Sequence, residues 1–347
     1  MVDRVKVAVI GVGRVFQHYK NLYCQGLLPG IEIVGLFDLD RKALMAEQFD
    51  KSIRLFYSLD EVLNADFVDA VFILTPSGAH YHIAKEIIQA KKATLIEKPM
   101  CLNVAEAREL QDLALQNGVY LQSVLQNRFN PAVRKLKELI ELREVTEPIS
   151  GGLRLRWSRK STYYQDAWHG TWKMDGGVIS QQAIHHIFAL DELFGPLQSV
   201  YVQSFKRKHS LEAEDTAVGF VKSVSGVPFT VELTTAASEV DFEASISLVC
   251  SQGVISIGGI ALNQLTIFNQ ISPKGEVLVE EYVPNGYGFG HIGEIKRFAS
   301  SFKNGKPDPC LEDSIRAVTL VQSFYHSIES NKEVLISEES VSKLLGR

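Results

Sequence analysis

Apolar residues in the first third of the chain occur in short β-branched runs that alternate with helix-forming stretches. The apolar runs cover residues 5–10, 31–37, 70–74, 94–96 and 119–124. Helical patterns lie between them, directly after the first run and over residues 41–49 and 82–90. Because parallel neighbouring strands need a crossover helix, this alternation predicts an α/β domain with a doubly wound parallel sheet over residues 1–124.

The pattern changes after about residue 147 to strand-like segments with short connections. These segments cover residues 152–157, 200–205, 217–221, 230–235, 244–249 and 265–269. Helical patterns cover residues 179–193, 293–304 and 312–330. We therefore predict an α+β C-terminal domain over residues 125–347, built on a large, open and mostly antiparallel sheet.

Length and composition agree with two globular domains. The chain has 347 residues, of which 46% are hydrophobic and 22% charged, typical of a soluble protein. The net charge of -5 provides no broad basic field, so we expect no nucleic-acid partner beyond small nucleotide ligands. Basic clusters at residues 154–160 and 206–208 fit anion contacts or solvated strand faces.

The sequence favours a cytoplasmic protein that does not contact a membrane. Met1 leads into the first strand-like segment without a basic leader or a long apolar stretch. The cysteines are too widely spaced for a zinc site or a disulfide scaffold: Cys24, Cys101, Cys250 and Cys310. We expect reduced thiols and no metal.

A glycine turn after the first strand is the first candidate for a functional site. Gly11 and Gly13 would let the backbone approach a pyrophosphate at the positive end of the next helix. A glycine turn also occurs without a ligand, and Phe16 stands where the dinucleotide motif has glycine or alanine. Asp38 ends the second strand, where a carboxylate accepts hydrogen bonds from a ribose and repels a 2′-phosphate. We therefore predict a Rossmann domain that prefers NAD to NADP, with Arg41 close enough to complicate this preference.

The tripeptide Glu97-Lys98-Pro99 follows the fourth strand, at the sheet end where such folds bind ligands. The Lys98 ammonium could hydrogen-bond a reacting hydroxyl and help to move its proton. An ordinary exposed turn would account for the tripeptide equally well.

Two histidines lie on the helix predicted after the glycine pair at residues 176–177. A lone histidine there is more often a packed residue than a base, but Gln181 lies four residues before His185, so both would share one helix face. An unperturbed imidazole titrates near about pH 6.5 and can accept a proton at neutral pH. His185 is therefore a candidate general base and Lys98, if desolvated, is the alternative, while packing in the core is the competing interpretation of the histidine.

An aromatic segment precedes these histidines and suits stacking on sugars or bases. Its members are Tyr163, Tyr164, Trp168 and Trp172, interleaved with Arg159, Gln165 and Asp166. Core packing is the competing interpretation. An arginine makes paired hydrogen bonds to carboxylate or phosphate oxygens, so Arg159 and Arg128 are candidates to hold the substrate.

Motifs along almost the whole chain carry a family resemblance. In order they are Gly11-Val12-Gly13, Thr75-Pro76-Ser77, Glu97-Lys98-Pro99, Gln126-Asn127-Arg128-Phe129, and Gly176-Gly177 through to His185. The chain thereby resembles the Gfo/Idh/MocA oxidoreductase family. Four segments look like its UDP-N-acetyl-2-amino-2-deoxyglucuronate 3-dehydrogenase branch: Trp157-Ser158-Arg159, Tyr163-Tyr164, Gly170-Thr171-Trp172, and Asp175-Gly176-Gly177 through to Gln182-Ala183-Ile184-His185.

The resemblance implies NAD-dependent oxidation of C3 in a nucleotide-linked sugar, in surface-polysaccharide or nucleotide-sugar biosynthesis, by a homodimer or homotetramer. It implies that Lys98 and His185 are the catalytic pair. The expected cofactor-binding residues are Gly11, Gly13, Arg14, Val15, Asp38, Thr75, Pro76, Ser77, His80, Glu97, Lys98 and Gln126. The expected substrate-binding residues are Arg128, Arg159, Tyr163, Tyr164, Trp172, Gln181 and His185.

The chain departs from the family at two positions. Gln181 and Phe188 stand where the family often has aspartates, and the branch tends to asparagine at the first. A glutamine can hydrogen-bond a sugar hydroxyl but cannot act as a base. Two other functions stay open: a ketoreductase or dehydrogenase for another sugar or cyclitol, and a dinucleotide-binding regulator that lost turnover. The reaction direction and recycling of NADH by a keto acid also stay open.

Overall fold

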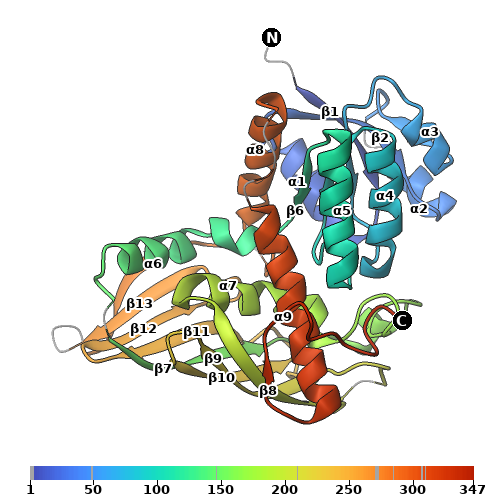
Figure 1. Ribbon diagram of the computed structural model, residues 1–347. Helices are drawn as coiled ribbons and strands as arrows, with labels where there is room; N and C mark the ends of the chain where they lie inside the picture. The colour runs from blue at the N-terminus through green and yellow to red at the C-terminus, as the bar shows by residue number, and fades with distance from the viewer. Residues whose placement is uncertain are drawn as a thin grey trace. The chain divides into compact units, whose positions relative to one another are not determined.

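The computed structural model describes residues 4–47, 50–145, 147–208, 210–269, 273–283, 285–305, 308 and 310–347. The chain divides into two compact units (Figure 1). The first contains Met1–Leu125 and His291–Ile315, and the second contains Gln126–Gly290 and Arg316–Arg347.

The first unit is built on a six-stranded parallel sheet, which confirms the doubly wound fold. Its strands, in spatial order, are β3 (Arg54–Phe56), β2 (Ile31–Phe37), β1 (Val5–Ile10), β4 (Ala70–Ile73), β5 (Ala93–Ile96) and β6 (Leu121–Ser123). Strands β4 and β5 are buried along their whole length. Because both faces of a parallel sheet are covered, such strands are continuous apolar runs, the pattern seen in the sequence.

Short helices connect these strands. They are α1 (Arg14–Cys24), α2 (Arg41–Ala46), α3 (Leu59–Leu63), the 3-10 turn η1 (Ser77–Ala79), α4 (His80–Gln89) and α5 (Val104–Asn117). The Asp40 and Ser58 side chains cap the N-termini of α2 and α3. The α2 helix ends before the predicted residue 49, and residues 48 and 49 lie outside the described residues. Helices α4 and α5 lie side by side on one face of the sheet (Figure 1).

Helix α8 (Gly290–Lys303) joins the first unit from far along the chain. The sequence assigned all of residues 125–347 to the C-terminal domain, whereas residues His291–Ile315 belong to the first unit. The reason is apolar packing: Phe298 is fully buried, with its ring edge-on to Phe72 at 5.1 Å and to Tyr120 at 5.2 Å.

The second unit is built on a nine-stranded sheet. Its spatial order is β14 (Glu276–Glu280), β13 (Gln264–Asn269), β12 (Gly253–Gly258), β11 (Glu243–Cys250), β7 (Pro148–Arg156), β10 (Pro228–Thr234), β9 (Thr216–Ser223), β8 (Leu197–Phe205) and β15 (Val334–Leu335). Neighbours are antiparallel except for β7 and β10, which confirms the mostly antiparallel sheet. The sequence pattern missed β12 and β14.

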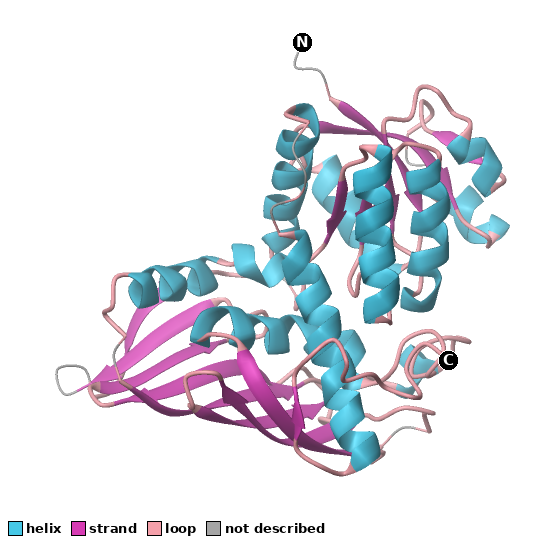
Figure 2. Ribbon diagram, viewed as in Figure 1, coloured by secondary structure: helices cyan, strands magenta, loops and turns pink. Residues whose placement is uncertain are grey.

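Helical segments lie over one face of this sheet (Figures 1 and 2). They include η2 (Gln126–Phe129), α6 (Pro131–Glu141) and α7 (Ile184–Phe194). The region also contains the 3-10 turn η3 (Ser161–Tyr164) and the end of α9 (Leu311–Ser330). None of the helices among the described residues is long and apolar enough to cross a membrane.

The other face of the sheet corrects one sequence interpretation. In the sequence, residues 200–205 and 230–235 carry apolar residues beyond one clean alternation, but β10 alternates regularly and turns polar side chains outward. On β9, in contrast, Val218 is 39% and Phe220 44% exposed. Other strands also expose apolar side chains, among them Ile149 of β7 at 57%.

Candidate active site

The turn between β1 and α1 leaves room for a dinucleotide. Gly11 has φ +95°, and a side chain there would place its Cβ 2.6 Å from the Leu74 carbonyl oxygen. A Cβ on Gly13, in contrast, would meet nothing within 4 Å. Gly13 precedes the first turn of α1, formed by the exposed Arg14 and the half-buried Val15. The space over Gly13, at the positive end of the helix, fits a pyrophosphate.

Asp38 is fixed beside this turn. Its carboxylate accepts hydrogen bonds from the backbone N–H groups of Val12 and Asp40, both at 2.8 Å. Each carboxylate oxygen can accept a further hydrogen bond, so ribose hydroxyls can still donate to Asp38. Arg41 is held elsewhere: its guanidinium donates to the Tyr57 carbonyl oxygen at 2.6 Å and lies 4.8 Å from the centre of the Tyr57 ring.

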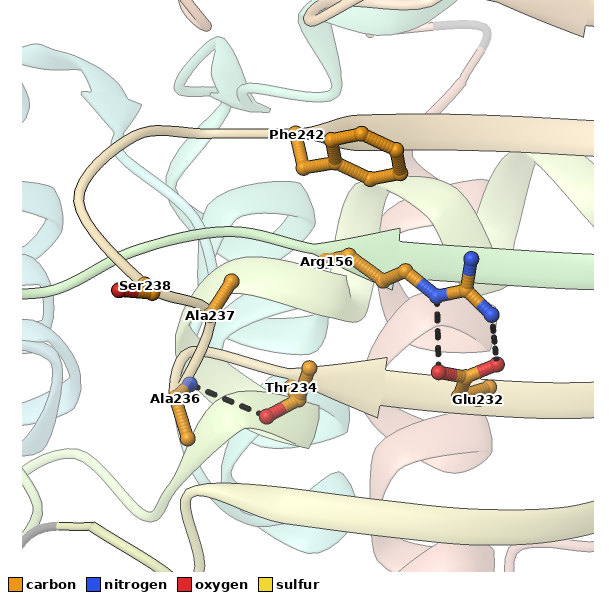
Figure 3. A pocket seen from close by; sticks show the side chains of 7 residues that line it. All are labelled: Arg156, Glu232, Thr234, Ala236, Ala237, Ser238 and Phe242. Carbon is orange, nitrogen blue, oxygen red and sulfur yellow. Dashed lines mark hydrogen bonds and ion pairs between the residues drawn. The ribbon is translucent and has the colours of Figure 1, made fainter.

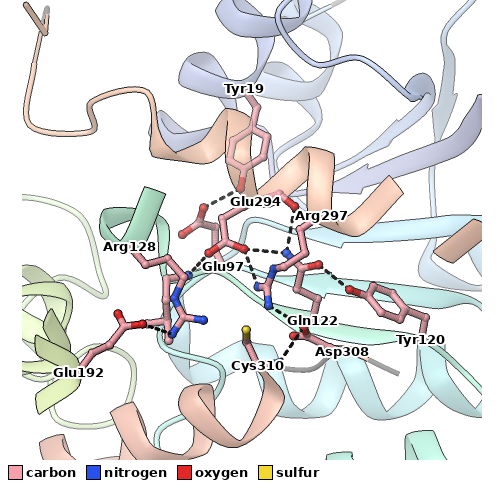
Figure 4. Close-up of polar contacts among 11 residues, drawn as sticks. Tyr19, Glu97, Tyr120, Gln122, Arg128, Glu192, Glu294, Arg297, Asp308 and Cys310 are labelled. Atoms are coloured by element: carbon pink, nitrogen blue, oxygen red, sulfur yellow. Dashed lines mark hydrogen bonds and ion pairs between the residues drawn. The ribbon is translucent and has the colours of Figure 1, made fainter. Parts of the chain in front are cut away.

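The Glu97-Lys98-Pro99 segment follows β5 and includes a cis peptide bond before Pro99. The Glu97 side chain is buried and accepts a hydrogen bond from the Tyr19 hydroxyl at 2.9 Å (Figure 4). The same oxygen accepts a second hydrogen bond from His291 Nε2 at 3.2 Å. Its other oxygen accepts the Lys98 backbone N–H at 3.0 Å. Glu97, which we expected to bind the cofactor, thus braces the backbone of the half-buried Lys98 against α1 and α8.

Electrostatics hold Glu97 as a carboxylate. Burial acts to raise its pKa, but the hydrogen bond from His291 and the charges of His291 and Lys98 outweigh burial and lower the pKa to about 2. The neighbouring His18 has its pKa lowered to about 3, first by burial and then by the charge of His291. Glu97 therefore places a fixed negative charge next to Lys98.

His80 joins the two loops that we expected to contact the cofactor. Its Nδ1 lies 2.7 Å from the Pro99 carbonyl oxygen and its Nε2 lies 2.9 Å from that of Thr75. Both ring nitrogens thus face the protein's own backbone. Pro76, which is half-buried, and Ser77, which is buried, lie between Thr75 and His80 in the sequence. His80 would affect a cofactor through the loops it holds.

A second buried network in the first unit was not predicted (Figure 4). The fully buried Glu294 accepts hydrogen bonds from Gln122 Nε2 at 2.8 Å, the Leu125 N–H at 2.8 Å and Arg297 at 2.6 Å. Arg297 also pairs with Asp308 at 2.6 Å. This network fixes α8 against the end of β6.

The predicted helix over residues 179–193 begins with a π turn, Ile179–Ala183, before α7. The backbone hydrogen bonds of a π turn span five residues instead of four, which the sequence pattern did not indicate. His185 is 7% exposed, and the buried Gln182 donates to the Tyr163 hydroxyl at 3.3 Å. Gln182, which was not among the predicted site residues, thus contacts the aromatic segment.

The aromatic segment packs beside this π turn, within the second unit. Trp157 meets the His186 ring edge-on at 5.4 Å. Arg159 lies over the Trp157 and Tyr163 rings and donates from Nη1 to Asp241 at 2.9 Å. Its charge is therefore partly neutralised, while Nη2 and Nε make no hydrogen bond to the described residues.

Other predicted members of this segment have structural partners. The Tyr164 hydroxyl lies 2.9 Å from Thr235 Oγ1, and burial raises the pKa of Tyr164 to about 12. Trp172 packs edge-on against Tyr325 at 5.3 Å, which favours core packing for this ring. His169 was missed: it pairs with Asp166 through Nδ1 and stacks on Trp168.

Arg128 and Phe188 lie together in the second unit. The Arg128 guanidinium lies 5.1 Å from the centre of the Phe188 ring and 3.9 Å from Glu192. Phe188, where the family often has an aspartate, thus contacts Arg128 through a cation–π interaction. Gln126, which we expected at the cofactor, starts the same η2 turn and is buried.

A shallow opening of about 350 Å³ lies at the end of the nine-stranded sheet (Figure 3). Arg156, one of the candidate anion contacts, lines it but is bound to Glu232 by two hydrogen bonds of 2.8 and 2.6 Å. Glu243 accepts a third at 3.0 Å. Because these carboxylates neutralise Arg156, the residue belongs to a solvated strand face.

The fold and the glycine turn define a class, an oxidoreductase with an NAD-binding Rossmann unit. Residues 5–124 match the family model described as the oxidoreductase family with an NAD-binding Rossmann fold. Residues 133–256 match the GFO/IDH/MocA C-terminal domain. The chain belongs to the GFO/IDH/MocA oxidoreductase family, as the sequence motifs predicted.

Individual relatives extend this assignment. An uncharacterised oxidoreductase of Synechocystis is 33% identical over 67% of this chain and 66% of its own length, just under two thirds. The NAD-dependent scyllo-inositol 2-dehydrogenase of Bacillus subtilis is 26% identical over 88% of both chains. The WlbA dehydrogenase of Bordetella pertussis, solved with NADH and UDP-GlcNAcA, is 26% identical over 96% of this chain and 98% of its own, with a TM-score of 0.85.

Proposed function

We propose that this protein oxidises the C3 hydroxyl of a nucleotide-linked sugar of the UDP-N-acetylglucosaminuronate type to a 3-keto sugar, with NAD as the oxidant. The observation that carries the proposal is the likeness over 96% of the chain to a dehydrogenase crystallised with NADH and UDP-GlcNAcA. The order of the Lys98 and His185 motifs agrees with it.

Residues of both units would take part in the proposed reaction. Gly11, Gly13 and Asp38 would hold NAD, which supplies the hydride acceptor. Lys98, braced by Glu97, would hydrogen-bond the C3 oxygen and stabilise the charge that develops on it. His185 would accept the hydroxyl proton while C3 loses its hydride, so that proton and hydride leave adjacent atoms as the carbonyl forms.

One alternative substrate class rests on a specific observation. The scyllo-inositol 2-dehydrogenase relative covers 88% of this chain at the same 26% identity as the nucleotide-sugar enzyme. A cyclitol presents the same secondary alcohol but no diphosphate. The two substrate classes thus differ in the anionic group that the second unit would have to bind.

A direct assay tests the proposal. Purified protein is mixed with NAD and, separately, UDP-N-acetylglucosaminuronate, free glucuronate and scyllo-inositol, while the absorbance of reduced nicotinamide is followed. We expect reduction with the nucleotide sugar alone. Reduction with scyllo-inositol alone would transfer the proposal to the cyclitol class, and NAD binding without any turnover would support a regulator.

The position of Asp38 leads to a prediction on cofactor choice. We expect much higher kcat/KM with NAD than with NADP, because the carboxylate would repel a 2′-phosphate. Asp38→Ala should reduce this discrimination by about tenfold or more, as expected for losing one hydrogen-bonded charge. The Arg41→Ala variant is the control, since Arg41 is held by Tyr57. Equal efficiency with NADP in the natural protein would contradict the prediction.

Arg159 provides a prediction on substrate binding. The two uncommitted nitrogens of its guanidinium could form paired hydrogen bonds to a carboxylate or diphosphate, which lysine cannot reproduce. Arg159→Lys should raise KM for the sugar far more than it lowers kcat. Arg156→Lys is the matched control, because Arg156 is committed to Glu232 and Glu243. An unchanged KM in Arg159→Lys would remove Arg159 from the site.

The exposed apolar residues of β9 support the prediction of a homo-oligomer. Val218 and Phe220 lie on the sheet face opposite α6 and α7, where a second copy could cover them. We expect a dimer or tetramer by light scattering at micromolar concentration. Phe220→Glu should shift the population towards monomers, and a monomeric natural protein would contradict the prediction.

A further inference from the structure

Two adjacent glycines bring the chain into direct contact with Glu214 and Tyr325 just before the His185 segment. A Cβ on Gly177 would lie 2.1 Å from the Glu214 carbonyl oxygen and 2.4 Å from its carboxyl carbon. Gly176 has φ +74°, and a Cβ there would lie 2.8 Å from the Tyr325 hydroxyl oxygen. No side chain fits at either position without displacing one of these partners.

Glu214 and Tyr325 fix three consecutive backbone N–H groups. Gly177 donates to the Tyr325 hydroxyl at 2.9 Å, and that hydroxyl donates to Glu214 Oε1 at 3.0 Å. Val178 donates to the Glu214 carbonyl oxygen and Ile179 to Glu214 Oε1, both at 3.0 Å. Ile179 begins the π turn that leads into α7 and His185.

Keeping this carboxyl buried costs stability. Glu214 is 2% exposed, and its Oε2 has no hydrogen-bond partner among the described residues. Burial raises the pKa of Glu214 to about 7; hydrogen bonds from Ile179 and Tyr325 oppose this shift, and the charge of Asp215 adds to it. Asp175, also buried, is a further acid near Tyr325. Buried carboxyl groups with a raised pKa are common at functional sites.

We propose that Glu214 and Tyr325 are positioning residues for His185: they set the start of the π turn and thereby the place of the imidazole. The inference rests on the proposed role of His185 as general base. Neither residue needs to touch the substrate, because both act through the backbone of residues 177–179. They would contribute to catalysis by orienting the His185 imidazole, because general-base catalysis depends on the position of the base.

Two substitutions that keep side-chain volume test this proposal. Tyr325→Phe removes the hydroxyl that links Gly177 to Glu214, and kcat should fall on the order of tenfold or more. Glu214→Gln keeps an acceptor for Ile179 and should retain more of kcat than Glu214→Leu does. The dissociation constant for NAD should stay unchanged in all three variants, because the proposed NAD residues other than Gln126 belong to the first unit. The control is Val231→Ala, a core truncation in β10 that lowers stability without touching the π turn.

Hydrogen exchange separates this inference from the proposed function. The amides of residues 177–183 should exchange faster in Tyr325→Phe than in Val231→Ala, whether or not the chosen sugar is oxidised. Faster exchange supports the positioning role even if the substrate proposal fails. Values of kcat and amide exchange in Tyr325→Phe that match those of Val231→Ala would overturn it.

The pH dependence of stability is an independent readout. Between pH 4.5 and about 7 the folded protein keeps the Glu214 proton that the unfolded chain has released, so the contribution of this group falls as pH rises. The free energy of unfolding of the natural protein, relative to that of Glu214→Gln, should therefore fall as pH rises from 4.5 to about 7. A constant difference would contradict the buried, proton-holding state of Glu214.

Discussion

Replacing His185 with asparagine is expected to lower turnover on the order of a hundredfold or more while NAD binding survives. The asparagine side chain keeps polarity and approximate size but cannot accept a proton at neutral pH. The expected NAD-binding residues other than Gln126 belong to the first unit, whereas His185 belongs to the second. Single-turnover kinetics and NAD titration by fluorescence measure the two effects separately.

Lys98→Met is the comparison that assigns the two roles. If Lys98 only orients and polarises the C3 oxygen, this variant should also turn over slowly but keep the pH dependence contributed by His185. His186→Asn is the control, since His186 packs against Trp157. Near-normal turnover in His185→Asn would eliminate the histidine as base and leave Lys98 as the candidate.

Glu97→Gln is expected to lower the free energy of unfolding by about 1–3 kcal/mol, the usual cost of leaving buried hydrogen-bonding groups poorly matched. The substitution removes the buried carboxylate that accepts hydrogen bonds from the Tyr19 hydroxyl, His291 Nε2 and the Lys98 backbone N–H. Urea unfolding at pH 7 measures the loss.

Glu109→Gln is the matched control for this prediction. Glu109 also accepts hydrogen bonds from a tyrosine and a cation, Tyr81 at 2.7 Å and Lys85 at 2.6 Å, but it is exposed to solvent, so its loss should destabilise the protein far less than the loss of Glu97. The lowered pKa of Glu97 means that its stabilisation is present above pH 4.5 and is lost as pH falls towards 2. The difference in the free energy of unfolding between the natural protein and Glu97→Gln should therefore become smaller as pH falls. Equal losses of unfolding free energy in Glu97→Gln and Glu109→Gln would contradict this prediction.

The first unit could be predicted from sequence because its signals are local. The β-branched run before Gly11 and the acidic residue at the end of the second strand lie within one βαβ unit of 38 residues from Met1 to Asp38. Parallel strands buried on both faces give continuous apolar runs, so the sheet followed from the pattern. The catalytic roles of Lys98 and His185 were predicted from the family motifs, because the chemistry of each residue alone did not distinguish a catalytic role from a structural one.

The contacts that position Lys98 and the His185 segment could not be predicted, because they join residues that are far apart in the sequence. Glu97 binds Tyr19 across 78 positions and His291 across 194 positions. Glu214 binds Tyr325 across 111 positions. No periodicity or turn signal connects such residues, and a histidine at the start of α8 looks like any packed residue.

The π turn is a third kind of failure. The helix-forming pattern over residues 179–193 indicates a helix but does not distinguish hydrogen bonds of four and five residues. Gln182, which lies in this π turn and donates to the Tyr163 hydroxyl, was not among the predicted site residues. The backbone contacts of residues 177–179 to Glu214, which the sequence does not reveal, accompany the change.

Transfer of an isotope tests the central claim most directly. The protein is incubated with NAD and the UDP-linked N-acetylglucosamine uronate carrying deuterium at C3, and the NADH formed is analysed by mass spectrometry. Our account predicts NADH one mass unit heavier than that formed from unlabelled sugar, because the hydride comes from C3. NADH of ordinary mass from the labelled sugar would contradict oxidation at C3.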